Sequence, residues 1–188
     1  MTSTTTGLNR AAGVARYALP SRWLHWIVAA IVLVMIPFGL VMANVVPQGA
    51  LQDTMFGLHE STGAVLLILM VLRLAARVAY GAPPADPTLG PTERKASQAA
   101  HHTLYLLLFV TPLFGWLGVN AYGYPVSVFG LFDLPTLLSK DEALSTRLTQ
   151  FHLAAALAIA AIAVLHIGAA LHHRYVRRDA ILRRISIG

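Results

Sequence analysis

The segment between His152 and His166 constrains the fold most, because every residue between these two histidines is apolar. In an α-helix, with a rise of about 1.5 Å and a turn of roughly 100° per residue, the two imidazoles lie ~21 Å apart on nearly the same face. A helix of this length and character suits the hydrocarbon core of a bilayer, which is about 30 Å thick. The segment therefore predicts a membrane-spanning helix with one histidine near each membrane surface.

Three further apolar segments are long enough to cross a bilayer if some tilt is allowed. The four predicted spans cover about residues 24–42, 55–76, 103–119 and 151–171. Charged residues make up only 12% of the chain, about half of what a soluble domain carries. We expect an all-α fold, a transmembrane four-helix bundle.

The remaining segments are predicted to connect these spans. A single domain is expected over residues 1–188, preceded by a flexible tail at 1–16. The connections fall at about 44–54, 80–101 and 120–150, and the stretch 131–149 favours a short surface helix interrupted at Pro135. The basic N-terminal segment lacks the short apolar region of a cleavable signal peptide, so we expect it to be retained.

The positive charges predict the orientation in the membrane. Twelve of the fourteen Lys and Arg residues lie in the N-terminal tail, the middle connection and the C-terminal tail. By the positive-inside rule, both termini are cytoplasmic. The inner face then carries +9 and the outer face −3, where only Lys140 and Arg147 are basic. We attribute the basic segments to orientation and to anionic lipid headgroups, and expect no nucleic-acid partner.

Four histidines within the spans pair by depth in this topology. His25 opens the first span and His166 lies near the inner end of the fourth, so both lie at the inner side. His59 begins the second span and His152 opens the fourth, both at the outer side. Ionisable residues within spans are rare and usually functional. The pattern predicts two bis-histidine sites stacked across the membrane.

A pair of imidazoles on facing helices is typical of haem ligation. Haem iron accepts axial nitrogen ligands from histidine, whereas zinc requires three or four protein ligands. The chain contains no cysteine, which excludes disulfides, iron–sulfur clusters and covalent c-type haem. The predicted cofactors are therefore two haem b groups, with His25, His59, His152 and His166 as the axial ligands of haem iron. Iron with both axial positions filled carries single electrons.

Several other residues admit two interpretations each. Arg73 lies fourteen residues after His59, so it either pairs with a haem propionate or follows the positive-inside rule. The glycines within the spans either pack helices or leave space for haem. Histidines at the inner boundary are expected to be interfacial rather than iron ligands, and the tryptophans to be membrane anchors. These groups are Gly39, Gly63, Gly115 and Gly168; His101, His102, His172 and His173; and Trp23, Trp26 and Trp116.

Short motifs in the chain match a known family in order and spacing. The sequence resembles the bacterial cytochrome b561 family, small four-helix di-haem cytochromes linked to quinone. The matching stretches cover about residues 16–186 and are Arg16-Tyr17, Leu24-His25-Trp26, His59–Gly63, Val71–Leu74, His101 with Tyr105, Pro112–Trp116, Gly123–Ser127, Phe129–Leu131, His152, Leu165-His166, His173, Arg178-Asp179 and Leu182-Arg183. The chain departs from the family pattern at His172 and Arg174, where Lys and His are common.

The resemblance implies the same four histidine ligands and a function in the bacterial inner membrane. Members carry electrons between the periplasmic side and the ubiquinone pool, and one activity in the family is superoxide oxidation with quinone reduction. The expected partners are membrane lipid, ubiquinone, and either superoxide or a periplasmic redox protein. His173 is then a candidate quinone contact and proton donor, and Trp26 a candidate lining of the quinone entrance.

Two other function classes remain open at this point. The chain could be a haem-bearing membrane-anchor subunit of a larger dehydrogenase or hydrogenase complex, although its compact connections favour an electron carrier that acts alone. It could also be a haem-free helical scaffold or transporter, which a visible absorption spectrum would distinguish. Whether the chain is itself an enzyme depends on its electron donor, which the sequence does not identify.

Overall fold

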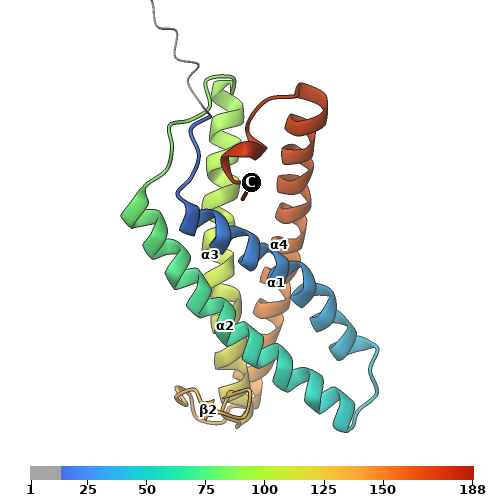
Figure 1. Cartoon of the computed structure of the whole chain (residues 1–188). Coiled ribbons are helices and arrows are strands. Elements are labelled where there is room, and N and C mark those ends of the chain that lie inside the picture. The colour runs from blue at the N-terminus through green and yellow to red at the C-terminus, as the bar shows by residue number, and fades with distance from the viewer. Residues whose placement is uncertain (1–13) are drawn as a thin grey trace, which may run out of the picture.

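Four long helices form an up-and-down bundle in the computed structural model, which describes residues 14–188 (Figure 1). Each helix is long and apolar enough to cross a membrane. The prediction of a transmembrane four-helix bundle is confirmed, and every predicted span lies inside a helix. The helices are α1 (Leu19–Asn44), α2 (Ala50–Tyr80), α3 (Pro91–Tyr122) and α4 (Glu142–His172).

The helices are longer than the predicted spans, so the predicted connections at 80–101 and 120–150 were too long. Pro91 begins α3, and the Glu93 carboxylate accepts a hydrogen bond of 2.8 Å from the Gly90 N–H. The Asp141 carboxylate caps α4 by accepting from the Leu144 N–H at 2.9 Å. Polar first turns therefore extend both helices beyond the apolar residues.

The predicted surface helix over 131–149 was wrong. Its first part contains strand β2 (Phe132–Asp133), which pairs with β1 (Ser127–Val128), and its last part is the start of α4. The turn between the strands uses Phe129 and Gly130 at φ of 52° and 69°. Pro135 does not interrupt a helix, because its carbonyl accepts from the Trp116 indole at 3.2 Å in an irregular segment. We call residues 123–141 the outer cap.

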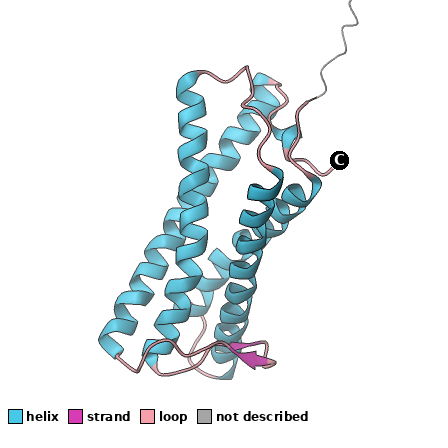
Figure 2. Ribbon diagram, turned by 90° about the vertical axis from the view of Figure 1, so that its left-hand side faces the viewer, coloured by secondary structure: helices cyan, strands magenta, loops and turns pink. Residues whose placement is uncertain are grey.

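The chain folds back on itself at the other end. A π-helical stretch, His173–Arg177, follows α4. Arg178 then adopts a left-handed conformation with φ of 55°, and a 3₁₀ turn, Leu182–Arg184, follows. We call residues 178–188 the C-terminal strap. Figure 2 shows the strands and the C-terminus at opposite ends of the bundle.

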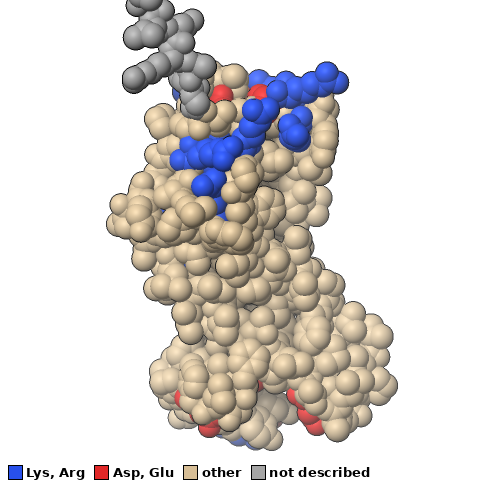
Figure 3. Space-filling view, in the orientation of Figure 1, with Lys and Arg blue, Asp and Glu red and all other residues tan. Residues whose placement is uncertain are grey.

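The buried core lies midway between the two ends. Met70 is fully buried, and around it pack Val28 and Val32 of α1, Leu66 of α2 and Ile159 of α4. Many large apolar side chains remain exposed along the helices, as is expected of a surface that faces lipid. On the face shown in Figure 3, Lys and Arg side chains gather at the end that holds the C-terminus.

Candidate functional site

The outer histidine pair joins α2 and α4. The ring centroids of His59 and His152 lie 5.9 Å apart, with the ring planes at 72°. Helices α2 and α4 are separated in the sequence by α3, so the two side chains come together only when the bundle folds. The pairing at the outer depth that the sequence predicted is therefore present in the structure.

The inner pair joins α1 and α4. The ring centroids of His25 and His166 are 6.4 Å apart, with the planes at 75°. Ile159, the buried α4 residue of the core, lies halfway along the chain between His152 and His166. The bundle thus holds two separate histidine pairs, one on each side of its core.

The separation within each pair suits two axial ligands on one iron. An imidazole nitrogen lies about 2 Å from a bound metal, so two axial imidazoles have ring centroids about 6 Å apart. Both measured separations fit this value. Among residues 14–188, no three His, Cys, Asp or Glu side chains converge as a metal site, so the arrangement fits haem rather than zinc.

Two glycines make room for the outer histidines. A Cβ atom on Gly39 would lie 3.0 Å from Cε1 of His59, and one on Gly115 would lie 3.1 Å from Nδ1 of His152. Either contact would force the imidazole to move. The helix-packing interpretation therefore applies to these two glycines, which fix the position of the outer pair.

A hydrogen bond selects the tautomer of one outer ligand. The Nδ1–H of His152 donates to the backbone carbonyl of Thr111 at 2.8 Å, which leaves Nε2 free to bind iron. Nδ1 of His59 is buried and has no hydrogen-bond partner among residues 14–188. A buried polar atom without a hydrogen-bond partner is unusual, and a group bound at this site would explain why the imidazole of His59 is buried here.

Gly63 and Gly168 differ from the other two glycines. No atom lies within 4 Å of a Cβ placed on either residue. Gly63 is one turn after His59 and so lies on the same side of α2, which fits the second interpretation, in which glycine leaves space for haem. Gly168 is two residues after His166 and therefore lies on the opposite side of α4 from that histidine.

Arg73 lies beside the inner pair. Its guanidinium stands over the ring of Tyr105, 5.3 Å from the centroid, and interacts electrostatically with His25 and His166. A cation held at this place would suit a haem propionate. His101 is also closer than we expected, since its ring centroid is 5.2 Å from that of His166. The sequence predicted an interfacial His101 because it gives the position of a residue along the helix but not the direction in which its side chain points.

Comparisons with known proteins agree with this geometry. A model of the prokaryotic cytochrome b561 family matches residues 16–187. This chain belongs to that family. It is 34% identical over 170 residues to cytochrome b561 homolog 2 of Escherichia coli K12, covering 90% of each chain. It is 28% identical over 170 residues to the probable superoxide oxidase CybB of Yersinia pestis, covering 90% of this chain and 95% of that one.

Membership of the cytochrome b561 family identifies the general chemistry. The protein binds b-type haem and transfers electrons in a prokaryotic membrane. The two histidine pairs are the candidate sites for such a haem in this bundle. The scaffold and transporter interpretation is thereby set aside.

The structure buries most of the His173 side chain where the strap meets the end of α4. Its Nδ1 lies 2.5 Å from the Asp179 carboxylate, and the two side chains are only 13% and 11% exposed. Asp179 also accepts the Ile181 N–H at 3.1 Å, so the pair holds the start of the strap. His102 and His172 are exposed, as the sequence led us to expect.

Trp26 joins the inner pair to the strap. Its indole N–H donates to the Ile185 carbonyl at 3.0 Å, and its ring lies 5.3 Å from that of His25 in an edge-on arrangement. Arg22 donates to the Ser186 carbonyl at 2.8 Å and the Tyr17 N–H to the Arg184 carbonyl at 3.0 Å. Sequence analysis missed these contacts, because most of them use backbone carbonyls that carry no signal in the residue types.

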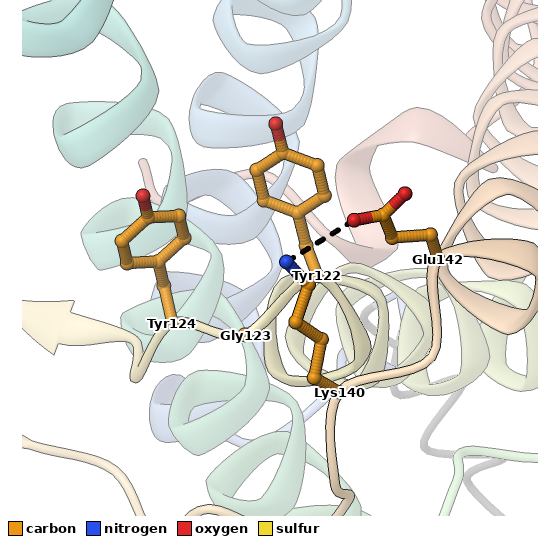
Figure 4. Close-up of a pocket in the computed structure, with 5 residues that line it drawn as sticks. All are labelled: Tyr122, Gly123, Tyr124, Lys140 and Glu142. Atoms are coloured by element: carbon orange, nitrogen blue, oxygen red, sulfur yellow. Dashed lines mark ion pairs between the residues drawn. The ribbon is translucent and has the colours of Figure 1, made fainter.

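The outer surface of the cytochrome has a shallow pocket of about 230 Å³ beside the outer cap (Figure 4). Tyr122, Gly123 and Tyr124 line it together with Lys140 and Glu142. The Lys140 ammonium lies 3.1 Å from the Glu142 carboxylate, which raises the pKa of Lys140. The positive charge of Lys140 is therefore largely balanced, which leaves Arg147 as the outer cation without an ion pair in the described chain.

Proposed function

We propose that the protein is a di-haem cytochrome b that carries electrons across the bacterial inner membrane between a periplasmic-side donor and the ubiquinone pool. The observation that supports it best is the pair of ring separations, 5.9 Å and 6.4 Å, at two depths of one bundle. Haem iron with two axial imidazoles exchanges single electrons, and its filled axial positions exclude substrate. His59 and His152 are the proposed outer ligands, and His25 and His166 the inner ligands.

The surrounding residues would hold and orient these ligands. The Thr111 carbonyl keeps His152 in the tautomer that binds through Nε2. Arg73, which Tyr105 supports from one face, would balance the charge of a propionate near the inner pair. Apolar side chains of the core separate the two sites and exclude water from the space between them.

We place ubiquinone reduction at the inner side. A lipid-soluble quinone approaches laterally, and Trp26 lies next to His25 on the half-exposed surface of α1. Reduction of a quinone consumes protons, and histidine is a common proton donor in proteins. Asp179 would hold the His173 ring in place. His173 thus supplies the proton in this proposal.

The electron donor is expected at the outer side, and superoxide is the donor that one relative's name suggests. An anion should be steered by positive charge, yet the predicted outer face is acidic and Lys140 is paired with Glu142. The dependence of the haem reduction rate on salt concentration distinguishes superoxide from a cationic donor. If superoxide is the donor and Arg147 steers it, stopped-flow haem reduction slows as salt rises, and Arg147→Gln removes that dependence. A rate that increases with salt would indicate a cationic donor, such as a basic periplasmic protein.

The di-haem proposal is tested by measuring the number of haem groups per chain. The pyridine haemochrome assay on the purified protein should return about two haem b per chain, one per histidine pair. A value near one haem per chain would exclude the proposal.

The proposed cytoplasmic position of both termini is tested separately, with a reporter fused at Gly188 that is active only in the periplasm. Activity of that reporter would reverse the assignment of inner and outer sites.

A further inference from the structure

A second pocket lies at the inner end, outside the histidine sites. It has a volume of about 220 Å³ and is lined by Arg174, Leu182, Arg183 and Ser186. Arg174 comes from the π-helical stretch that continues α4, and the other three belong to the C-terminal strap. The pocket therefore forms only where the strap returns against the end of the fourth helix.

The two arginines of this pocket have no internal partner. Neither guanidinium forms an ion pair or hydrogen bond with any residue between 14 and 188. Two acidic groups at this end of the bundle are engaged elsewhere, since Asp179 binds His173 and Glu93 binds Arg177 at 2.5 Å. Two like charges in one pocket repel each other unless an anion lies between them.

The chemistry of the lining indicates which anion fits. Guanidinium groups bind phosphate oxygens through paired N–H donors, and the Ser186 hydroxyl adds a further polar group. Leu182 gives the pocket an apolar wall, which a small inorganic ion does not need and a lipid does. The pocket lies at the end of a membrane-spanning helix, and Figure 3 shows Lys and Arg side chains gathered at that end of the bundle. Basic residues next to a membrane span are typical contacts of anionic headgroups.

We propose that this pocket binds the phosphate group of an anionic ligand, with Arg174 and Arg183 as its two cationic contacts. The shared chemistry is a phosphate that carries at least one negative charge, presented by an anionic phospholipid or by a soluble phosphate. Occupancy joins the strap to α4 and neutralises the repulsion between the two guanidiniums. The proposal does not depend on the number of haems or on the electron donor.

Native mass spectrometry of the full-length, haem-loaded protein tests the site. The probes are phosphatidylglycerol, phosphatidylcholine as the neutral lipid, and inorganic phosphate as the soluble source. We expect one tightly held phosphatidylglycerol per chain and no comparable retention of phosphatidylcholine. The double variant Arg174→Gln with Arg183→Gln should weaken the binding at least tenfold, because two charge-assisted contacts are lost. The matched control, Arg94→Gln with Lys95→Gln, removes the same charge from the same face and should bind normally.

Each outcome decides the proposal. Retention of phosphatidylglycerol that depends on the two pocket arginines supports the lipid as the source. Binding of inorganic phosphate that depends on the same arginines, without lipid retention, supports the soluble source. Equal weakening in both double variants would overturn the site in favour of diffuse attraction to a basic surface. If the pocket variant does not fold, the wild-type comparison still decides, since equal retention of the two lipids and no competition by phosphate contradict the proposal.

Discussion

The two ends of the bundle each close over a histidine pair, but they do so in different ways. The outer cap is fixed by buried side chains: the Ser61 hydroxyl accepts the Phe129 N–H at 2.9 Å, and Asn120 accepts the Leu137 N–H at 2.9 Å. Both anchoring residues are only 1% exposed. The inner end is closed by the strap, whose contacts are mostly made by arginine side chains and exposed backbone carbonyls.

The surroundings of the two histidine pairs also differ between the two ends. Gly39 and Gly115 lie close to the outer imidazoles, since a Cβ on either residue would contact a ring. The inner pair instead has the side chains of Arg73 and His101 close to it. The outer pair is therefore confined by glycine backbone and the inner pair by polar side chains. The comparison therefore predicts different sensitivities to mutation.

Removing one ligand should have the largest effect and should affect only one end. We expect His152→Ala to reduce the haem content from about two to about one per chain, and His59→Ala to remove the same haem. His25→Ala should remove the other one. Pyridine haemochrome content and reduced-minus-oxidised spectra measure this, with the exposed His102→Ala as the control. Loss of the same haem from His25→Ala and His152→Ala would refute the pairing.

Replacing Gly39 or Gly115 by alanine should have the second largest effect, and it should disturb the outer end. Gly39→Ala and Gly115→Ala place a Cβ about 3 Å from His59 and His152, and overpacking of this kind costs about 1–3 kcal/mol. We expect a lower unfolding temperature and a spectral change confined to the outer haem. Gly57→Ala, on α2 two residues before His59 and with no atom near its Cβ, is the matched control. An equal effect in the control would mean that helix flexibility, not contact, is responsible.

Loss of the Ser61 hydroxyl should loosen the outer cap. Ser61→Ala leaves the Phe129 N–H and the Ser127 carbonyl without their partner, at a cost of about 1–3 kcal/mol. Hydrogen exchange at residues 127–133 should quicken while exchange in the strap is unchanged. Ser186→Ala, which removes a hydroxyl that bonds only within the strap, should cost less. A uniform rise in exchange across both ends would contradict independent closure.

Acid should produce the smallest effect and should act on the inner end alone. The Gly90 N–H, and then Arg177, hold the pKa of Glu93 below its usual value of 4.5. The contribution of Glu93 is therefore complete above that value and is lost as the pH falls through the lowered pKa. We expect faster hydrogen exchange around residues 88–94 in acid, before any change in the outer cap, whose anchors do not titrate. Glu93→Gln should remove this pH dependence.

The sequence predicted the four helices and the depth of each histidine, because helix periodicity and bilayer thickness are local constraints on the chain. It also led to the correct pairing of helices at each depth. It did not predict the hydrogen bond from His152 to the Thr111 carbonyl, nor the burial of His173 against Asp179, because both depend on how distant segments pack. The surface helix over 131–149 failed for a similar reason: β2 pairs with β1, and the distant Asn120 side chain accepts the Leu137 N–H.

The distances along the chain between contacting residues also set an order in time. Ser61 and Phe129 of the outer end are 68 residues apart, whereas Trp26 and Ile185 of the inner end are 159 apart. At a synthesis rate of roughly 5–20 residues per second, the segment that completes the outer end emerges about 3–14 s after Ser61, and the one that completes the inner end about 8–32 s after Trp26. The growing protein therefore keeps the end closed by the strap open for longer than the end closed by the outer cap, which leaves a period in which cofactor and lipid can enter there.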